Sequence, residues 1–224
     1  MVASTGRFSA CRVEQPVPRG ERRRREIAAV AEQVFFENGF TDATMQSIAV
    51  RAGASKETLY RHFGSKEELF AEIVEARARD FIQDLDEHFS RTGTVEQILT
   101  GVGLRGIEML FDPVAIKLCR TVIAESPRNP ALGCIFLDEG PHRVRLGLSK
   151  FLTGATARGE LACPDPDQAA TFFFGLVMAS LHLERLVLIP PPRMSEDEVR
   201  HHVDEAVAIF LARYAPRRSA STAS

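Results

Sequence analysis

The sequence predicts an all-α protein. Apolar residues recur at the three- and four-residue spacing of amphipathic helices, and no segment alternates apolar and polar residues as a half-buried strand would. Most prolines stand between the apolar runs, where they separate helices. With 224 residues, 45% of them hydrophobic, the chain is long enough to bury a core without disulfides or bound metal.

The first helix is predicted from an apolar stripe that ends before Gly39, a residue that commonly stops helices. The stripe consists of Ile27, Val30, Ala31, Val34 and Phe35. Residues 1–19, which precede this helix, have no apolar period and are predicted to form a disordered tail.

Two short helices follow, each bounded by a capping residue and a glycine. Thr44 is the predicted N-cap of the second helix, and Gly53 ends it after about two turns. Ser55 is the predicted N-cap of the third helix, and Gly64 closes it. The third helix has few apolar residues to bury, so its polar surface is predicted to serve a partner.

A long fourth helix is predicted over residues 66–89. Ser65 is its N-cap, and Glu67 and Glu68 lie in its first turn, where the positive end of the helix dipole favours acidic side chains. At a rise of 1.5 Å per residue, this helix is roughly 36 Å long.

The remaining chain is also predicted to be helical. The predicted helices cover residues 94–111, 113–125, 130–158, 167–188 and 195–214. Pro141 should kink or split the helix in which it lies. About nine helices are expected in total, followed by a second disordered tail at residues 215–224.

Capping residues mark the starts of the last two helices. Either Asp165 or Asp167 should cap the helix at residues 167–188, and Ser195 should cap the final one. The most apolar run, residues 172–189, contains His182, Glu184 and Arg185 and is interpreted as a buried helix without a membrane span.

The second and third helices, with a glycine between them, have the spacing of a helix-turn-helix. Ala49 and Ala52 allow the helices to approach closely, and Gly53 can adopt the left-handed conformation that the turn needs. The predicted core of this unit consists of Phe35, Phe40, Ile48, Leu59 and Phe63. The remaining faces of the third helix are left for DNA.

The charge distribution is uneven along the chain. Residues 1–66 contain 11 Lys and Arg against 7 Asp and Glu, whereas the rest contains 17 against 23. A basic head on an acidic body suits a polyanionic partner at one end only. Chance is the alternative, because differences of this size between halves are common.

The segment FFENGFTDATMQSIAVRAGASKETLYRHFGSKEELF, residues 35–70, closely resembles the N-terminal DNA-binding domain of TetR-type transcriptional regulators. The resemblance extends over about residues 22–73. Its ordered landmarks are Phe35, Gly39, Thr44, Ile48, Ala49, Ala52, Gly53, Leu59, Tyr60, His62, Phe63, Lys66 and Leu69.

The resemblance implies that eight residues contact DNA. Those implied to face the major groove are Lys56, Thr58 and Arg61. Those implied to contact the phosphate backbone are Thr44, Ser55, Tyr60, His62 and Lys66.

Several of these roles have alternatives. Arg61 either reads O6 and N7 of a guanine or only holds a phosphate. Glu57 either accepts a hydrogen bond from a cytosine or pairs with Arg61 one turn later, and the pairing is favoured because such helix pairs are common. The basic segment at residues 18–26 either reaches phosphate or the minor groove, or is a solvated helix start. Taken singly, Tyr60 and His62 are ordinary surface side chains, and their place beside the glycine turn favours DNA contact.

From about residue 94, the chain resembles the C-terminal ligand-binding domains of TetR-type regulators. Residues 136–177, with a Gly-Pro turn, basic residues and an Arg-Gly-Glu-Leu ending, resemble the AefR-type subgroup. The resemblance implies a homodimer in which the last two long helices form a four-helix bundle with their partners. The implied dimerisation residues are Gly175, Ala179, Leu183, Leu186, Val203, Val207, Phe210 and Leu211. The alternative for each is a place in the core of its own chain.

The same resemblance implies a pocket for a small apolar effector, aromatic or acyl in character, among the helices of residues 94–181. The candidate lining residues are Leu104, Ile107, Leu110, Phe111, Leu118, Val122, Phe136, Phe151, Phe173, Phe174 and Met178. A single Phe or Met at helical spacing is more often core than pocket, so these residues form an unranked pool.

No cofactor or metal site is expected. Cys119 and Cys134 raise oxidation as a rival trigger, but burial as small hydrophobic side chains is favoured. His201 and Glu205 either bind a metal weakly or lie on an exposed helix face, which is favoured. No catalytic sequence motif is visible, so an enzyme is disfavoured.

The sequence therefore predicts a DNA-binding domain at residues 20–66 and a ligand-binding and dimerisation domain at residues 67–214, whose first helix connects the two. The predicted function is a sequence-specific transcriptional regulator, most simply a repressor that an effector releases from a near-palindromic operator. The alternative is an activator or architectural DNA-binding protein without an effector. The expected partners are duplex DNA, a second copy of the chain and the effector. The expected location is the cytoplasm, since the cysteines lack disulfide or metal spacing and the N-terminus lacks a signal-peptide core.

Overall fold

The computed structural model describes residues 19–89 and 93–216, with the side chains of residues 19, 80 and 84–89 left out. Within these ranges the chain forms eleven α-helices and no strand, which confirms the all-α prediction. Both predicted tails fall largely on residues 1–18 and 217–224, which lie outside the described ranges. The helices are α1 (Arg19–Asp42), α2 (Met45–Arg51), α3 (Lys56–Phe63), α4 (Lys66–Phe89), α5 (Val95–Phe111), α6 (Pro113–Glu125), α7 (Pro130–Glu139), α8 (Pro141–Ala157), α9 (Pro166–Met178), α10 (Leu181–Val187) and α11 (Glu196–Tyr214).

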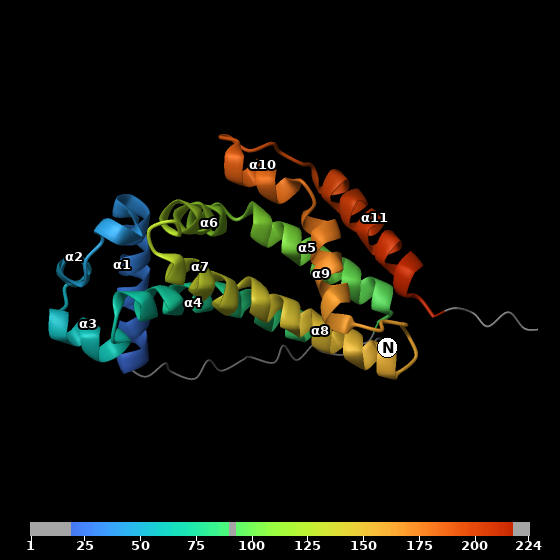
Figure 1. The fold of residues 1–224 in the computed structure, drawn as a ribbon, viewed down its shortest axis with the longest axis horizontal. Helices are drawn as coiled ribbons and strands as arrows, with labels where there is room; N and C mark the ends of the chain where they lie inside the picture. Colours follow the sequence, from blue (N-terminus) through green and yellow to red (C-terminus); the bar gives the residue numbers. More distant parts are fainter. Residues whose placement is uncertain (1–18, 90–92, 217–224) are drawn as a thin grey trace, which may run out of the picture.

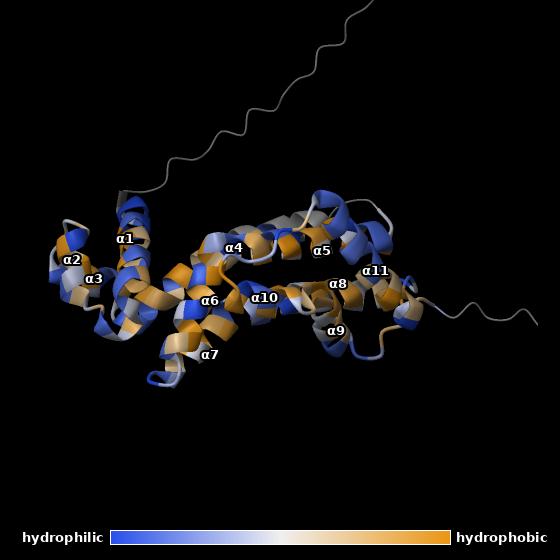
Figure 2. Ribbon diagram, turned by 90° about the horizontal axis from the view of Figure 1, so that it is seen from above, coloured by the Kyte–Doolittle hydropathy of each residue, from blue (hydrophilic) through white to orange (hydrophobic). Residues whose placement is uncertain are grey.

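The molecule is elongated, with α1, α2 and α3 at one end and α11 near the other (Figure 1). Helix α4 leaves the small N-terminal unit and runs into the body, where it lies along α7 and α8. Most helices carry both hydrophobic and hydrophilic residues, as amphipathic helices do (Figure 2). Because α4 runs from one end of the molecule into the other, it connects the N-terminal unit to the body.

The predicted helix starts are confirmed by hydrogen bonds. The hydroxyl of Ser55 accepts from the backbone N–H of residue 58 at 3.1 Å, and the hydroxyl of Ser65 accepts from that of residue 68 at 3.0 Å. Thr44 and Ser195 form reciprocal capping boxes with the residues three positions later. Of the two candidates at the start of α9, Asp165 is the cap. Each bond satisfies a backbone donor that the first turn leaves without a helical acceptor.

Two helix boundaries differ from the prediction. Gly39 interrupts α1 with φ 79° and ψ 163°, but helical turns continue to Asp42. The helix predicted at residues 167–188 is wrong as a single helix, because it breaks at Ala179, whose φ is 39°. With the split at Pro141, this break raises the count from about nine to eleven.

None of the described helices is by itself long and apolar enough to cross a bilayer. Helices α9 and α10 reach that length and hydrophobicity only as a pair, and the pair is bent by 57°.

Two buried clusters organise the fold. The head cluster contains the predicted helix-turn-helix core, with Leu59 and Phe63 of α3 buried in the same cluster as Phe35, Phe40 and Ile48. It also includes Phe70 of α4, whose ring lies 5.5 Å from that of Phe40 in an edge-on arrangement. Side chains from the body complete it, namely Leu118, Val122 and Leu132. The head therefore packs directly on α4, α6 and α7. The body cluster fills the space among α5, α8, α9 and α11.

Candidate nucleic-acid interface

Helix α3 lies at the outer end of the molecule (Figure 1). Leu59 and Phe63 are buried, whereas Lys56 and Arg61 are exposed and Tyr60 is 45% exposed. A helix of eight residues with two buried anchors leaves most of its circumference to solvent. That geometry allows α3 to enter a groove of a duplex without losing its own core contacts.

The turn before α3 sets the direction of this helix. Gly53 has φ 57°, a left-handed conformation that costs glycine little, and the N–H of Ala54 donates to the carbonyl of Ala49 at 2.9 Å. The hydroxyls of Ser55 and Thr58 lie 2.8 Å apart across the first turn of α3. The N-terminal end of α3 is therefore held by local bonds and is not free to fray.

The predicted pair between Glu57 and Arg61 is wrong. No ion pair or hydrogen bond joins these two exposed side chains among the residues that the structure describes. Lys56 instead lies near Tyr60, with its Nζ 5.8 Å from the ring centre. Both Glu57 and Arg61 therefore keep their polar groups available to a partner.

Lys66, a predicted phosphate contact, is bonded within the chain. Its ammonium group donates to the carbonyl oxygens of Phe40, Ala43 and Thr41 at 2.7, 2.9 and 3.2 Å, and lies 4.4 Å from the centre of the Phe40 ring. A lysine has three N–H donors, and all three are used within the chain. The end of α1 has carbonyls without helical partners, and Lys66 satisfies them. A phosphate contact by Lys66 would have to break these bonds.

Part of the basic segment at residues 18–26 is also used inside the head. Arg23 donates to the carbonyls of Ala52 and Gly53 at 2.7 and 3.0 Å. Arg24 donates to the carbonyl of His62 at 2.6 Å and pairs with Glu72 of α4. Sequence reasoning missed these roles, because nothing local to an arginine indicates which distant carbonyl it reaches.

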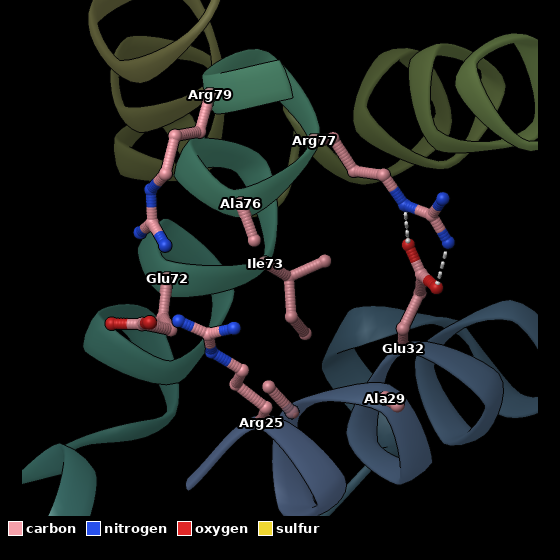
Figure 3. A pocket seen from close by; sticks show the side chains of 9 residues that line it. Arg25, Ala29, Glu32, Glu72, Ile73, Ala76, Arg77 and Arg79 are labelled. Carbon is pink, nitrogen blue, oxygen red and sulfur yellow. Dashed lines mark hydrogen bonds and ion pairs between the residues drawn. The ribbon is translucent and has the colours of Figure 1, made fainter. Parts of the chain in front are cut away.

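Helices α1 and α4 enclose a groove of about 310 Å³ (Figure 3). On one side, Arg77 of α4 forms two hydrogen bonds with Glu32 of α1, at 2.8 and 2.6 Å. A second pair, between Arg24 and Glu72, joins the same two helices. Because both pairs join α1 to α4, a tilt of α4 is expected to move α1 with it.

A second connection joins the head to the body. Glu125, in the last turn of α6, is buried and accepts hydrogen bonds from the backbone N–H of Thr41 at 3.0 Å and from the Thr41 hydroxyl. The carboxylate also lies against Gly39, where an added Cβ would come within 2.7 Å of its Oε1 atom. This contact fixes the end of α1 relative to α6.

Comparison with protein families identifies both ends of this arrangement. Residues 27–73 match the family described as bacterial regulatory proteins, tetR family. Residues 97–216, more than half of the chain, match the family described as AefR-like transcriptional repressor, C-terminal domain. The chain belongs to the TetR family. It is therefore a DNA-binding transcriptional regulator with a helix-turn-helix head.

Individual relatives agree with this assignment. A TetR-family regulator from Mesorhizobium loti is 32% identical, and the match covers 89% of this chain and all of that one with a TM-score of 0.76. The flavonoid-responsive regulator FrrA is 29% identical over 88% of this chain and 99% of its own, with a TM-score of 0.75. The transcriptional activator FasR of Mycolicibacterium smegmatis is 34% identical over 96 residues, 43% of this chain and 42% of FasR.

The residues predicted to line an effector pocket do not gather in one place. Leu118, Val122 and Phe136 belong to the head cluster. The other candidates belong to the body cluster or pack on it, and Ile107 and Phe173 are buried there almost completely. The partly buried members of the pool are Leu104, Phe111, Phe136, Phe151, Phe174 and Met178. The pool therefore divides between two cores, as expected when apolar spacing alone is used to choose lining residues.

Part of the predicted dimerisation set lies in the core of its own chain, the alternative given for each of these residues. Val203, Val207 and Phe210 are at most 2% exposed, because this face of α11 packs on α5 and α9 of its own chain. The ring of Phe210, for example, lies 5.4 Å from that of Phe173. Leu186 and Leu211 are partly buried, whereas Gly175, Ala179 and Leu183 remain exposed.

A different apolar surface is exposed on the last three helices. Its large members are Phe172, Leu183, Val187, Ile189 and Ile209, each more than half exposed. Residues 172, 176, 179, 183 and 187 recur at spacings of three and four, so this stripe was visible in the sequence as a second apolar face.

The cysteines give no support to a redox trigger at Cys119. Burial raises the pKa of its thiol to about 11, so the reactive thiolate is scarce at neutral pH. Cys134 is exposed and Cys163 is buried. His201 and Glu205 are both exposed, and the described residues contain no cluster of metal-ligating side chains.

Proposed function

We propose that this TetR-family regulator is a ligand-responsive repressor that binds a near-palindromic operator as a homodimer and leaves it when a small molecule binds the body. The observation that carries the DNA-binding half of the proposal is the exposed polar face of α3 at the outer end of the molecule. The repressor role is supported by the AefR-like repressor family that matches the body.

Helix α3 supplies the contacts to bases in this proposal, and its flanks supply those to phosphate. Lys56, Thr58 and Arg61 face the major groove, whereas Tyr60 and His62 approach the backbone. The hydroxyls of Thr44 and Ser55 cap α2 and α3. In this proposal, the same positions bring the two hydroxyls near the phosphate backbone of DNA. Lys66 is left out, since its donors hold the end of α1.

Arg61→Ala is expected to relax the base preference at one position of each half-site. A bidentate guanidinium contact to guanine contributes about 1–3 kcal/mol of discrimination between bases. The measurement is selection of binding sites from a random duplex pool with the wild-type protein and the variant. The control is Arg158→Ala, which removes an exposed arginine of the body and should leave the selected sequence unchanged. An identical profile for Arg61→Ala would reduce Arg61 to a backbone contact.

The proposed dimer forms through the exposed apolar surface of α9, α10 and α11. A surface of several large apolar side chains on neighbouring helices is typical of a protein interface. Gly175, Ala179 and Leu183, three residues predicted from the sequence to form the dimer, are exposed in the same part of the chain.

Leu183→Glu is expected to convert the dimer into a monomer, because two charges would be buried at the symmetric interface without partners. Light scattering should give twice 24.8 kDa for the wild-type chain and 24.8 kDa for the variant. Leu146→Glu provides the matched control, since Leu146 is a half-exposed leucine of α8 outside this surface. A wild-type monomer, or a Leu183→Glu dimer of unchanged stability, would contradict the proposed interface.

The response to a ligand is proposed to pass through α4 and α6. Effector binding in the body favours one position of these helices, and their contacts with α1 then change the separation of the two heads. A flavonoid is the class of molecule named for one 29% identical relative, which supports an aromatic effector. Loss of binding to a selected duplex on addition of ligand tests the response, and a reporter gene under that duplex distinguishes a repressor from an activator such as FasR.

A further inference from the structure

Arg185 is a buried cation without an anionic partner. Only 8% of its surface is exposed, and its guanidinium lies over the ring of Phe111, 3.6 Å from the ring centre. No described residue accepts a hydrogen bond from this guanidinium or forms an ion pair with it. Burial lowers its pKa below the ordinary value for arginine, and the nearby Glu184 only partly opposes this shift. A charge removed from water without a partner is costly, which points to an anion that binds here.

The side chain of Arg185 faces the body and not the exposed apolar surface. Leu181, one turn earlier on the same face of α10, packs on the body cluster. Leu183 and Val187 lie on the opposite face and are 65% and 66% exposed. A second copy of the chain that covers Leu183 and Val187 would therefore leave Arg185 on the far side of α10. An anion that binds Arg185 is therefore expected to approach from the body side of α10.

A second arginine in the same seam already has acceptors within the chain. Arg120 of α6 donates to the backbone carbonyls of Arg185, Leu186 and Leu188 at 2.7, 3.0 and 3.2 Å. These bonds satisfy the carbonyls at the end of α10 and hold this helix on α6. Arg120 therefore positions α10, and the donors of Arg185 remain available.

The surroundings of Arg185 are apolar on the body side. The Phe111 ring supports one face of the guanidinium. Met178, just before α10, reaches α5, where its methyl group would lie 3.8 Å from a Cβ at Gly106. Between Met178 and α10, Ala179 has φ 39°, a conformation that is strained for any residue with a Cβ and that separates α10 from α9. A ligand at this place would meet a cation and an aromatic side chain together.

We propose that Arg185 anchors the acidic group of an amphipathic organic anion, a carboxylate or phenolate on an aromatic or acyl body, and that this anion is the effector. The inference rests on the proposed ligand-responsive function and adds the chemical class of the ligand. A guanidinium binds a carboxylate through two parallel hydrogen bonds, which are stronger away from water. Arg120 joins α10 to α6. A ligand that turns α10 would therefore also act on α6, whose last turn carries Glu125, the residue bonded to the end of α1.

The test uses 2-naphthoate as the anionic probe and 2-naphthamide as its uncharged counterpart. The chain has no tryptophan, so naphthalene fluorescence reports binding with little background. The wild-type protein should bind 2-naphthoate at least about tenfold more tightly than 2-naphthamide, the factor expected for a hydrogen bond to a charged group. Arg185→Met should abolish this preference and leave the affinity for 2-naphthamide unchanged. Arg200→Met, at an exposed position of α11, should have no effect.

Thermal unfolding without ligand provides an independent readout. Arg185→Met should keep or raise the melting temperature, because it removes an unpaired buried charge. Arg120→Met in the same seam should lower the melting temperature, because three carbonyls lose their donor. A clear drop for Arg185→Met would mean that the guanidinium already has a partner within the protein, and would overturn the proposal.

The remaining outcomes separate the anion site from the proposed function. Equal affinity of the wild-type protein and Arg185→Met for 2-naphthoate, or no binding by either, overturns the site. Release of a selected duplex by saturating 2-naphthoate, lost in Arg185→Met, supports both proposals. Arg185-dependent binding that leaves the duplex bound keeps the site and contradicts the response to an effector.

Discussion

Replacing Lys66 by Met is expected to lower the free energy of unfolding by about 2 kcal/mol, the scale of hydrogen bonds made by a charged group. The substitution removes the donor that serves the carbonyls of Phe40, Thr41 and Ala43 at the end of α1, and two of these bonds are partly buried. It also removes the cation above the Phe40 ring. Urea unfolding followed by circular dichroism gives the change directly.

The same variant distinguishes a structural lysine from a phosphate contact. If Lys66 serves α1, the salt dependence of DNA binding by the folded variant should match that of the wild-type protein. If it holds a phosphate, the slope against salt concentration should fall by about one, with stability nearly unchanged. Lys150→Met, at an exposed position of α8, is the control for loss of one positive charge.

The parts of the fold that the sequence predicted depend on short-range chemistry. A capping hydroxyl or carboxylate and the N–H that it accepts from are two or three residues apart, so Ser55 and Ser65 could be assigned from the sequence and the cap of α9 narrowed to Asp165 or Asp167. The split at Pro141 follows from the missing N–H of proline. The ordered motif around α2 and α3 then identified the DNA-binding head, whose core was predicted residue by residue.

The parts that were missed depend on tertiary contacts. Lys66 and Arg24 reach carbonyls 23 to 38 residues away, and a basic residue near a predicted DNA surface has no sequence feature that indicates such a use. On α11, helical spacing identified an apolar face at Val203 and Phe210 but not which neighbour covers it. The break at Ala179 lacks the glycine or proline that would have marked it.

These contacts give the head three attachments to the rest of the chain. Two ion pairs join α1 to α4, and one of them, between Arg77 and Glu32, is drawn in Figure 3. The third attachment, between Glu125 and Thr41, joins α1 to α6 and is a buried hydrogen-bonded contact. Glu32 and Glu125 are equally buried, and a buried carboxylate that loses its donors is costly, so the pair of Glu32 with Arg77 and the contact of Glu125 are both expected to hold the head. The contact of Glu125 differs in joining α1 to α6.

Glu125→Leu is expected to lower the free energy of unfolding by about 1–3 kcal/mol, because the N–H and hydroxyl of Thr41 lose their acceptor. It should also weaken binding to a selected two-site duplex by about fivefold or more, the usual lower range of coupling between sites. The affinity falls because the two heads of the dimer are no longer held at a fixed angle, so binding to both half-sites has to restrict their motion. Binding to a single half-site should change much less.

A double-mutant cycle with Thr41→Val isolates this contact from other effects of the leucine. If the hydrogen bond carries the coupling, the double variant should bind the two-site duplex as tightly as Glu125→Leu alone, so the two effects on affinity are not additive. Glu125→Gln keeps an acceptor for the N–H of Thr41 and should retain most of the affinity. Equal losses at the two-site duplex and the half-site would instead assign Glu125 to stability alone, and additive losses would place the coupling between head and body in α4.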